Sequence, residues 1–269
     1  MNENLYNKYE ELKSYLKSFD TLAIAFSGGV DSTFLLYAAN EAMNGKVTAI
    51  TAKSNLFPDR EYRESVRFAK QYANKHIVYE VDELGVKGFE ENPPNRCYLC
   101  KQHIFQEMIQ LASKQNIKFL AEGSNMDDMG DYRPGLKAIE ELNVLSPLRT
   151  AGLYKQEIRM LSKEFGLETW NKPSFACLAS RFVYGEKITK EKLEMVGNAE
   201  QYLLDLGFNQ VRVRIHDELA RIEIEECEME KIMIPQIIKS VNNKLKALGF
   251  KYVSLDLQGY RTGSMNELL

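Results

Sequence analysis

Hydrophobic and polar positions alternate with two different periods along the first half of the chain. Leucines and tyrosines in residues 2–19 recur at intervals of three and four, which predicts an amphipathic helix. Short apolar runs typical of buried strands follow at 21–26, 47–52, 76–82 and 118–123. Helical spacing separates these runs at 33–43, 60–75 and 100–116. Because hairpin signals are lacking up to about Gly123, we expect a parallel sheet wrapped by helices, with ligands at the carboxyl ends of its strands.

The pattern changes in the last third of the chain. Residues 171–186, NKPSFACLASRFVYGE, have little helical periodicity and are expected to form an ordered loop. Helical spacing then resumes at 188–207 and stops at a glycine. We expect the later elements to be strands at 210–217, 220–226 and 251–257 and a proline-interrupted helix at 229–249. Two domains are therefore predicted, residues 1–175 and 186–269, joined by the 171–186 loop.

Composition and charge narrow the class of protein. The 269 residues are 44% hydrophobic and 27% charged, which is typical of a soluble globular chain. No apolar run is long enough to span a bilayer, and the charged N-terminus lacks the apolar core of a signal peptide, so we expect a cytoplasmic protein without a membrane partner. The net charge of −3 gives no overall attraction to nucleic acid, which is not an expected partner.

The chain has four cysteines, too few for a disulfide framework at this length. Cys97 and Cys100, in PPNRCYLCKQ, have the spacing of a metal, redox or disulfide pair, and spacing alone leaves these open. Cys227 lies in an acidic segment and is expected to have no role. The three histidines show no ligand spacing: His76, His103 and His216.

The most specific local signal is AFSGGVDSTFLL, where Ser27, Gly28 and Gly29 follow a predicted strand and open a predicted helix. Glycines let backbone N–H groups approach an anion, and a helix N-terminus favours negative charge. Asp31 can hold Mg²⁺ against phosphate oxygens, and Ser32 completes the motif. A tight turn with Asp31 as a helix cap is the alternative. The lysine of a Walker A motif is missing, which disfavours a kinase or P-loop ATPase.

SGGVDS resembles the PP-loop of the N-type ATP pyrophosphatases, which include NAD synthetase, GMP synthetase, argininosuccinate synthetase and sulfur-inserting tRNA enzymes. The resemblance implies an α/β adenine nucleotide alpha hydrolase-like domain, to which a smaller α+β C-terminal domain is added here. It also implies that a substrate oxygen attacks the α-phosphorus of ATP. Pyrophosphate then leaves, and a nitrogen or sulfur nucleophile later replaces AMP.

A second motif, EGSNMDDMGDYRPG, would by itself indicate only a polar surface loop. Together with SGGVDS, residues 145–181 and the C-terminal RVRIHDELARIEI, it resembles the LarE family over nearly the whole chain. This family comprises the ATP-dependent sulfur transferases that build the nickel-pincer nucleotide of lactate racemase. The resemblance implies that four residues of the motif lie beside ATP: Gly123, Asn125, Asp128 and Arg133.

The resemblance also gives Cys177 a central role. It implies that the substrate is pyridinium-3,5-dicarboxylic acid mononucleotide, whose adenylated carboxylate is attacked by this cysteine. Cleavage of the Cβ–S bond would then leave a thiocarboxylate on the substrate and dehydroalanine on the protein. Arg181 lies close by in PSFACLASR and should favour the thiolate. A small buried cysteine without chemistry is the alternative.

Further residues match family positions. Ser180, Arg181 and Glu200 are expected at the catalytic site, although Glu200 would otherwise be an ordinary helix carboxylate. Arg212 and Arg214 alternate on one predicted strand, so both can bind the substrate phosphate. A solvated strand face is the alternative for these two arginines.

The pair Cys97 and Cys100 departs from the sacrificial version of the family. With Cys177, the pair is expected to bind three corners of a [4Fe–4S] cluster, as in certain tRNA thiolases and cluster-bearing LarE relatives. An exogenous sulfide donor would then supply the sulfur, and the protein would turn over. A redox pair that regenerates Cys177 as a persulfide, and a zinc site with Cys227 or a histidine as fourth ligand, are the alternatives.

The resulting expectation is an AMP- and pyrophosphate-forming sulfur transferase that uses ATP, Mg²⁺ and a [4Fe–4S] cluster, and that forms a homo-oligomer such as a hexamer. A [4Fe–4S]-dependent tRNA thiolase is the main alternative, and it predicts a basic surface and salt-dependent RNA binding. An amidotransferase-type synthetase would need a glutaminase region. A nucleotide-sensing or metal-binding module would bind ATP without cleaving it.

Overall fold

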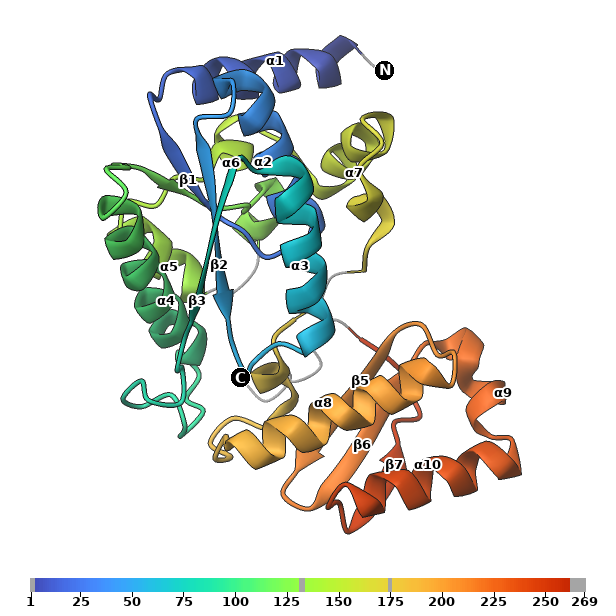
Figure 1. The fold of residues 1–269 in the computed structure, drawn as a ribbon. Coiled ribbons are helices and arrows are strands. Elements are labelled where there is room, and N and C mark those ends of the chain that lie inside the picture. The colour runs from blue at the N-terminus through green and yellow to red at the C-terminus, as the bar shows by residue number, and fades with distance from the viewer. Residues whose placement is uncertain (1–2, 131–133, 174–175, 262–269) are drawn as a thin grey trace. The chain divides into compact units, whose positions relative to one another are not determined.

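The computed structural model describes residues 3–130, 134–173 and 176–261 (Figure 1). Contacts divide the chain into two compact units, each described by itself below. The first unit comprises residues 1–54, 58–83 and 97–175, and the second comprises 55–57, 84–96 and 176–269. The second unit therefore takes in two short segments from the first half of the chain.

The first unit is built on a parallel sheet, as its sequence pattern predicts. The strands are β1 (Leu22–Ala25), β2 (Val47–Lys53), β3 (Lys75–Glu80) and β4 (Leu120–Ala121). They run in the order β3-β2-β1-β4 with parallel pairing throughout, so that Ile24 of β1 pairs with Ala49 of β2 and with Ala121 of β4. The chain thus runs outward from β1 through β2 to β3 and then returns to β4 on the other side of β1, which places a topological switch point between β1 and β4.

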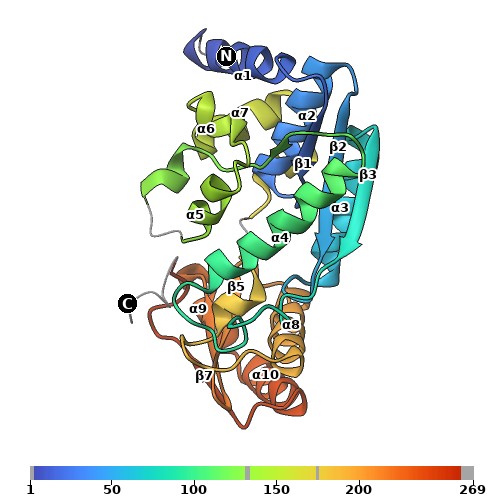
Figure 2. The ribbon, with the colours of Figure 1, turned by 90° about the vertical axis from the view of Figure 1, so that its left-hand side faces the viewer.

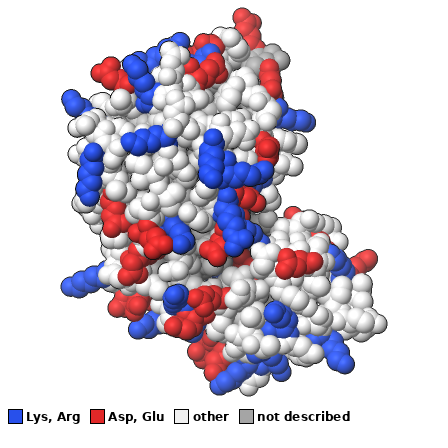
Figure 3. All heavy atoms as spheres, viewed as in Figure 1, with Lys and Arg blue, Asp and Glu red and all other residues white. Residues whose placement is uncertain are grey.

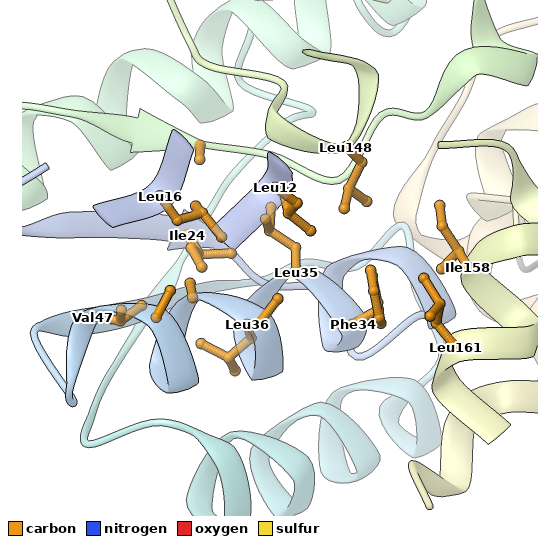
Figure 4. Packing of buried hydrophobic residues seen from close by; sticks show 14 of the residues in the cluster. Leu12, Leu16, Ile24, Phe34, Leu35, Leu36, Val47, Leu148, Ile158 and Leu161 are labelled. Carbon is orange, nitrogen blue, oxygen red and sulfur yellow. The ribbon is translucent and has the colours of Figure 1, made fainter. Parts of the chain in front are cut away.

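Helices cover both faces of this sheet. Along the chain they are α1 (Glu3–Lys17), α2 (Val30–Met43), α3 (Asp59–Tyr72), α4 (Arg96–Ser113), α5 (Pro134–Glu141), α6 (Pro147–Thr150) and α7 (Lys155–Glu164). One core joins Leu12 and Leu16 of α1 and Leu35 of α2 to Ile24 and Val47 of the sheet (Figure 4). The opposite face is covered by α4 and α5, which Figure 2 brings to the front. The alternating strands and helices of the sequence thus form three layers.

Helix α4 differs from its prediction at both ends, and its last residue, Ser113, lies three residues before the predicted end at 116. The sequence pattern placed its start at Cys100, and this is wrong by four residues because the helix begins at Arg96. Two prolines precede it, and the Arg96 N–H donates to the carbonyl oxygen of Pro93 at 2.9 Å, which closes the first turn. Cys97 and Cys100 therefore both lie on the helix, three residues apart and on one face.

The second unit contains a small mixed sheet. Its regular elements are α8 (Lys190–Asp205), β5 (Val211–His216), β6 (Leu219–Ile224), α9 (Met229–Ile232), α10 (Pro235–Ala247) and β7 (Tyr252–Leu255). The predicted strands β5 and β6 form an antiparallel hairpin, and β7 pairs with β6 in parallel. The expected break in the C-terminal helix falls before Pro235, the first residue of α10.

Short 3₁₀ turns complete the described chain. They are η1 (Met126–Gly130), η2 (Glu168–Asn171), η3 (Leu178–Arg181) and η4 (Glu226–Glu228). None of the helices in the described ranges has the length and apolar character needed to cross a membrane. Acidic and basic side chains are interspersed on the face that Figure 3 presents.

Candidate functional site

The SGGVDS segment leaves β1 and enters α2 through a backbone shape that requires glycine. Gly28 has a φ of +70°, and a Cβ atom there would come within 2.8 Å of the Cα and Cβ atoms of Ser65. Gly29 then caps α2. The loop therefore presses its backbone against α3 and places the N-terminus of α2 at the carboxyl end of β1, where an anion is favoured.

Two hydroxyl groups close this loop on itself. The Oγ atoms of Ser27 and Ser32 lie 3.1 Å apart, and the Ser32 hydroxyl also reaches the carbonyl oxygen of Gly29 at 3.3 Å. The two ends of the predicted phosphate loop are thereby tied together. The loop is a defined turn before any ligand binds, so little ordering is needed when an anion arrives.

The second motif meets this loop at the topological switch point. Gly123 follows β4, and a Cβ atom there would lie 3.0 Å from the backbone nitrogen of Ser32, so the β4 loop approaches α2 closely. Asn125, which is 4% exposed, donates from Nδ2 to Oδ1 of Asp31 at 3.3 Å. Two motifs about a hundred residues apart in the chain are thus brought together at one edge of the sheet.

Asp128 holds the backbone of this motif in place through a hydrogen bond. Its Oδ2 accepts a hydrogen bond from the backbone N–H of Asn125 at 2.9 Å, and the Asn125 side chain accepts one from the N–H of Asp127 at 2.9 Å. These bonds orient the Asn125 amide toward Asp31. Arg133, the remaining residue predicted beside ATP, lies outside the described residues.

Two lysines that the sequence analysis missed also reach the loop. Lys155, the first residue of α7, forms an ion pair with Oδ2 of Asp31. Lys172 donates to the Gly28 carbonyl oxygen at 3.3 Å and pairs with Glu61 at 2.8 Å and Glu64 at 2.7 Å. A positive charge in the first turn of a helix is unfavourable with respect to the helix dipole. The position of Lys155 at the start of α7 was therefore the one sign in the sequence that this lysine pairs with an acidic residue outside the helix.

The donor set around Asp31 fits Mg²⁺. This ion retains several waters and binds one or two carboxylates together with substrate phosphates, so a single partly exposed carboxylate beside a phosphate loop suffices. The Asp31 side chain is 22% exposed. Its carboxylate already lies between Asn125 and Lys155, which hold it in place at the loop.

In the second unit, the turn that carries Cys177 encloses a buried arginine. Arg181 is fully buried, and its Nη1 donates to the carbonyl oxygens of Ala176 at 3.1 Å and Cys177 at 3.2 Å. The same nitrogen reaches Oγ of Ser180 at 2.7 Å, and that hydroxyl donates to the Cys177 carbonyl at 2.8 Å. Ser180 and Arg181 thus fix the backbone at Cys177, whose side chain is half-buried.

Glu200 of α8 is the counter-charge of this arginine. Its carboxylate receives Nε of Arg181 at 2.7 Å and Nη2 at 3.0 Å, and it also accepts from the Val213 N–H at 3.0 Å. One carboxylate therefore joins α8, β5 and the Cys177 turn. Its contacts are those of a residue that positions others.

Arg212 and Arg214 lie on β5 with 6% and 5% exposure, so the alternative of a solvated strand face is excluded. Arg214 donates to the Ser180 carbonyl at 2.9 Å and to Oε2 of Glu223 at 2.8 Å. Arg212 lies 5.2 Å from the ring centre of Tyr260. Burial lowers the pKa of Arg212, and the nearby charge of Arg181 lowers it further. Arg181 and Arg214 already have buried counter-charges in Glu200 and Glu223. An anion close to Arg212 would offset the repulsion from Arg181.

The cysteines are divided between the two units. Cys97 and Cys100 belong to the first and Cys177 to the second. Within the described ranges, no three His, Cys, Asp or Glu side chains are gathered in a way that could hold a metal ion. The helical pair offers two thiols on one face, which fits two corners of an iron–sulfur cluster. A third ligand has to come from elsewhere in the chain. Cys227 is exposed, with Glu225 as its neighbour at 3.9 Å.

Several known proteins resemble this chain in sequence. No protein-family model matches the chain. The chain is 36% identical over 266 residues to pyridinium-3,5-bisthiocarboxylic acid mononucleotide synthase of Lactiplantibacillus plantarum, covering 98% of this chain and 96% of that one. It is 38% identical over 265 residues to an uncharacterized protein of Synechocystis, covering 98% and 99%. GMP synthase of Dehalococcoides mccartyi is 26% identical over 200 residues, covering 65% of this chain and 37% of that one.

The parallel sheet, the glycine loop at its switch point and the GMP synthase likeness define an ATP-using PP-loop enzyme with the adenine nucleotide alpha hydrolase-like fold. The full-length likeness is more specific. The chain belongs to the pyridinium-3,5-bisthiocarboxylic acid mononucleotide synthase (LarE) family, whose members are ATP-dependent sulfur-transferring enzymes.

Proposed function

We propose that this protein converts the carboxylates of pyridinium-3,5-dicarboxylic acid mononucleotide into thiocarboxylates at the expense of ATP. One observation supports this most directly. Arg214, a candidate ligand of the substrate phosphate, donates to the Ser180 carbonyl within the turn that carries Cys177. Phosphate binding and the sulfur-bearing residue are thereby coupled inside one unit.

The first step takes place at the loop of the first unit. A substrate carboxylate oxygen attacks the α-phosphorus of ATP, the bond to the bridging oxygen of the β-phosphate breaks, and pyrophosphate leaves with Mg²⁺. The backbone of Ser27, Gly28 and Gly29 and the N-terminus of α2 would hold the departing pyrophosphate. Asp31 would bind Mg²⁺, and Asn125 and Lys155 would keep its carboxylate in place.

In the sacrificial route, the second step takes place at Cys177. Its thiolate attacks the carbonyl carbon of the acyl adenylate, AMP leaves with the electron pair of the acyl–oxygen bond, and a thioester forms. A base then removes the α-proton of Cys177 and the Cβ–S bond breaks. The sulfur remains on the substrate as a thiocarboxylate, and the residue becomes dehydroalanine. The hydrogen bonds from Ser180 and Arg181 to the Cys177 carbonyl hold the backbone during both events.

An alternative to this sacrificial route uses Cys97 and Cys100 together with Cys177, and the cysteine pair favours it. Cys97, Cys100 and Cys177 would together ligate a [4Fe–4S] cluster, and when bound it would supply an open iron for exogenous sulfide, so that Cys177 is not consumed. The helical pair supports this, because its thiols share one face of α4.

The decisive experiment measures product and metal together. Protein purified without oxygen is incubated with ATP, Mg²⁺ and the pyridinium dicarboxylate nucleotide, and pyrophosphate and thiocarboxylate are counted per chain. Release of pyrophosphate that requires the nucleotide, together with a gain of sulfur on it, supports the proposed reaction. Thiolation of tRNA in place of the nucleotide would contradict it.

Iron and acid-labile sulfide per chain then separate the two sulfur sources. About four irons, lost in Cys97→Ala, Cys100→Ala and Cys177→Ala alike, support the cluster. An iron-free protein after attempted reconstitution, with dehydroalanine at position 177 after one turnover, supports the sacrificial route.

A further inference from the structure

Arg96 is a buried charge with an unexpected partner. It is 4% exposed, and its Nη1 donates to the carbonyl oxygen of Ala179 at 2.9 Å and to Oδ1 of Asn92. Ala179 is fully buried and lies inside η3, two residues after Cys177. A guanidinium is costly to bury unless its donors are used, so this contact is a built feature of the turn.

Asn92 extends the same support to the segment that leaves the turn. It is fully buried and has a φ of +50°, which asparagine tolerates better than most residues. Its Nδ2 donates to the carbonyl oxygen of Val183 at 2.6 Å, and its own carbonyl accepts from the N–H of Gly185 at 2.9 Å. Through Asn92 and Arg96, the 84–96 segment therefore contacts the chain at Ala179, Val183 and Gly185.

The Cys177 turn is thus held by three guanidinium groups, those of Arg96, Arg181 and Arg214, which bind different carbonyls of the turn. Arg181 binds the carbonyls of Ala176 and Cys177, and Arg96 binds that of Ala179. Arg181 is itself part of η3, whereas Arg96 is 83 residues away from Ala179 in sequence. Arg214 of β5 binds the next carbonyl of the turn, that of Ser180, so Arg96 and Arg214 both tie η3 to other parts of the second unit.

We propose that Arg96 is a positioning residue for sulfur transfer, and this inference rests on the proposed function. With Asn92 it holds η3 in the conformation that presents the Cys177 sulfur, while it takes no part in the adenylation at the first unit's loop. A misplacement of about 1 Å at a reacting group can cost about a hundredfold in rate.

The test separates the two steps in Arg96→Gln and Arg96→Lys. Pyrophosphate release in the first turnover should stay within about twofold of the parent protein, whereas thiocarboxylate formation should fall by about 10- to 100-fold in Arg96→Gln. Arg96→Lys, which keeps the charge and one donor direction, should recover part of the rate. Val241→Ala, a core truncation in α10, is the control for lost stability and should leave both steps unchanged below its unfolding temperature.

A second readout requires no substrate. The rate at which iodoacetamide alkylates Cys177 in the folded protein, followed by peptide mass spectrometry, should change at least threefold in both Arg96 variants and not in Val241→Ala. Unchanged alkylation and transfer in Arg96→Lys and Arg96→Gln would overturn the inference, and so would equal losses in adenylation and transfer. A parent protein that makes no thiocarboxylate would instead overturn the proposed function, and the alkylation rates would still decide the role of Arg96.

Discussion

The guanidinium of Arg181 and the carboxylate of Glu200 form a two-point ion pair, with Nε–Oε1 and Nη2–Oε2 distances of 2.7 and 3.0 Å. The two side chains are 0% and 3% exposed. The third guanidinium nitrogen of Arg181, Nη1, donates to the carbonyl oxygen of Cys177. A buried charge pair in the core of the second unit therefore determines the backbone next to the reactive thiol.

Removal of Glu200 should be severely destabilising. Glu200→Ala leaves Arg181 buried without its counter-charge, which typically costs about 3–5 kcal/mol in the free energy of unfolding. Urea denaturation measures this loss. The matched control is the surface pair of Arg67 and Glu168, whose side chains are 61% and 51% exposed. Glu168→Ala should cost at most about 1 kcal/mol. Similar losses in the two variants would show that the buried pair is not a structural determinant.

Gly28→Ala should weaken ATP binding through the loop backbone. The new Cβ atom would lie 2.8 Å from Ser65, so the loop has to move away from α3. Gly152 is a suitable control, because its φ of +64° imposes similar strain while no atom lies within 4 Å of its added Cβ. Gly152→Ala should lose about 1–2 kcal/mol of stability, which is the cost of a left-handed alanine, and Gly28→Ala should lose more because of its additional contact with Ser65. Only Gly28→Ala should raise the dissociation constant of ATP, by at least tenfold, in a calorimetric titration.

Stability should fall when the pH drops from 7 toward 5.5. Burial lowers the pKa of His76 and of His216, so the folded state resists a proton that the unfolded state accepts below about 6.5. The unfolded state therefore binds more protons in this range, and the free energy of unfolding decreases with falling pH. The double variant His76→Gln/His216→Gln should show a shallower dependence between pH 7 and 5.5. An unchanged slope in urea titrations at several pH values would contradict this assignment.

The fold was largely predictable because its signals are local. Each strand of the first unit is a short apolar run, and the paired strands of the second unit alternate around Asp217, whose φ is +55°. The start of α4 was misplaced because polar residues that follow two prolines resemble a loop. The hydrogen bond from Arg96 to the Ala179 carbonyl joins residues 83 positions apart, so the local sequence does not indicate it. The site was harder to predict from the sequence. Lys155 lies 124 residues from Asp31 and Lys172 lies 144 residues from Gly28, so no spacing motif joins them.

Lys172 provides a prediction about the nucleotide site. Its ammonium group joins the Gly28 carbonyl to Glu61 and Glu64 of α3, and its side chain is 15% exposed. Lys172→Met keeps most of the aliphatic chain but removes the charge. The loop then loses a charge-assisted hydrogen bond worth about 1.5–3 kcal/mol, and two carboxylates are left unneutralised close to where the triphosphate binds. The expected result is at least a tenfold weaker binding of Mg²⁺–ATP.

A matched control for Lys172→Met is Lys8→Met. Lys8 is also partly buried, and it binds Glu157 and the Gly152 carbonyl at 2.8 Å each, away from the glycine loop. The weakening in Lys172→Met should lessen at high salt, because added ions screen the repulsion between the phosphates and the two glutamates. Removal of both carboxylates in Glu61→Gln/Glu64→Gln should restore part of the affinity in the Lys172→Met background. If ATP binds Lys172→Met and Lys8→Met equally well, the lysine does not set the electrostatics of the loop, and the Gly28 backbone alone maintains its shape.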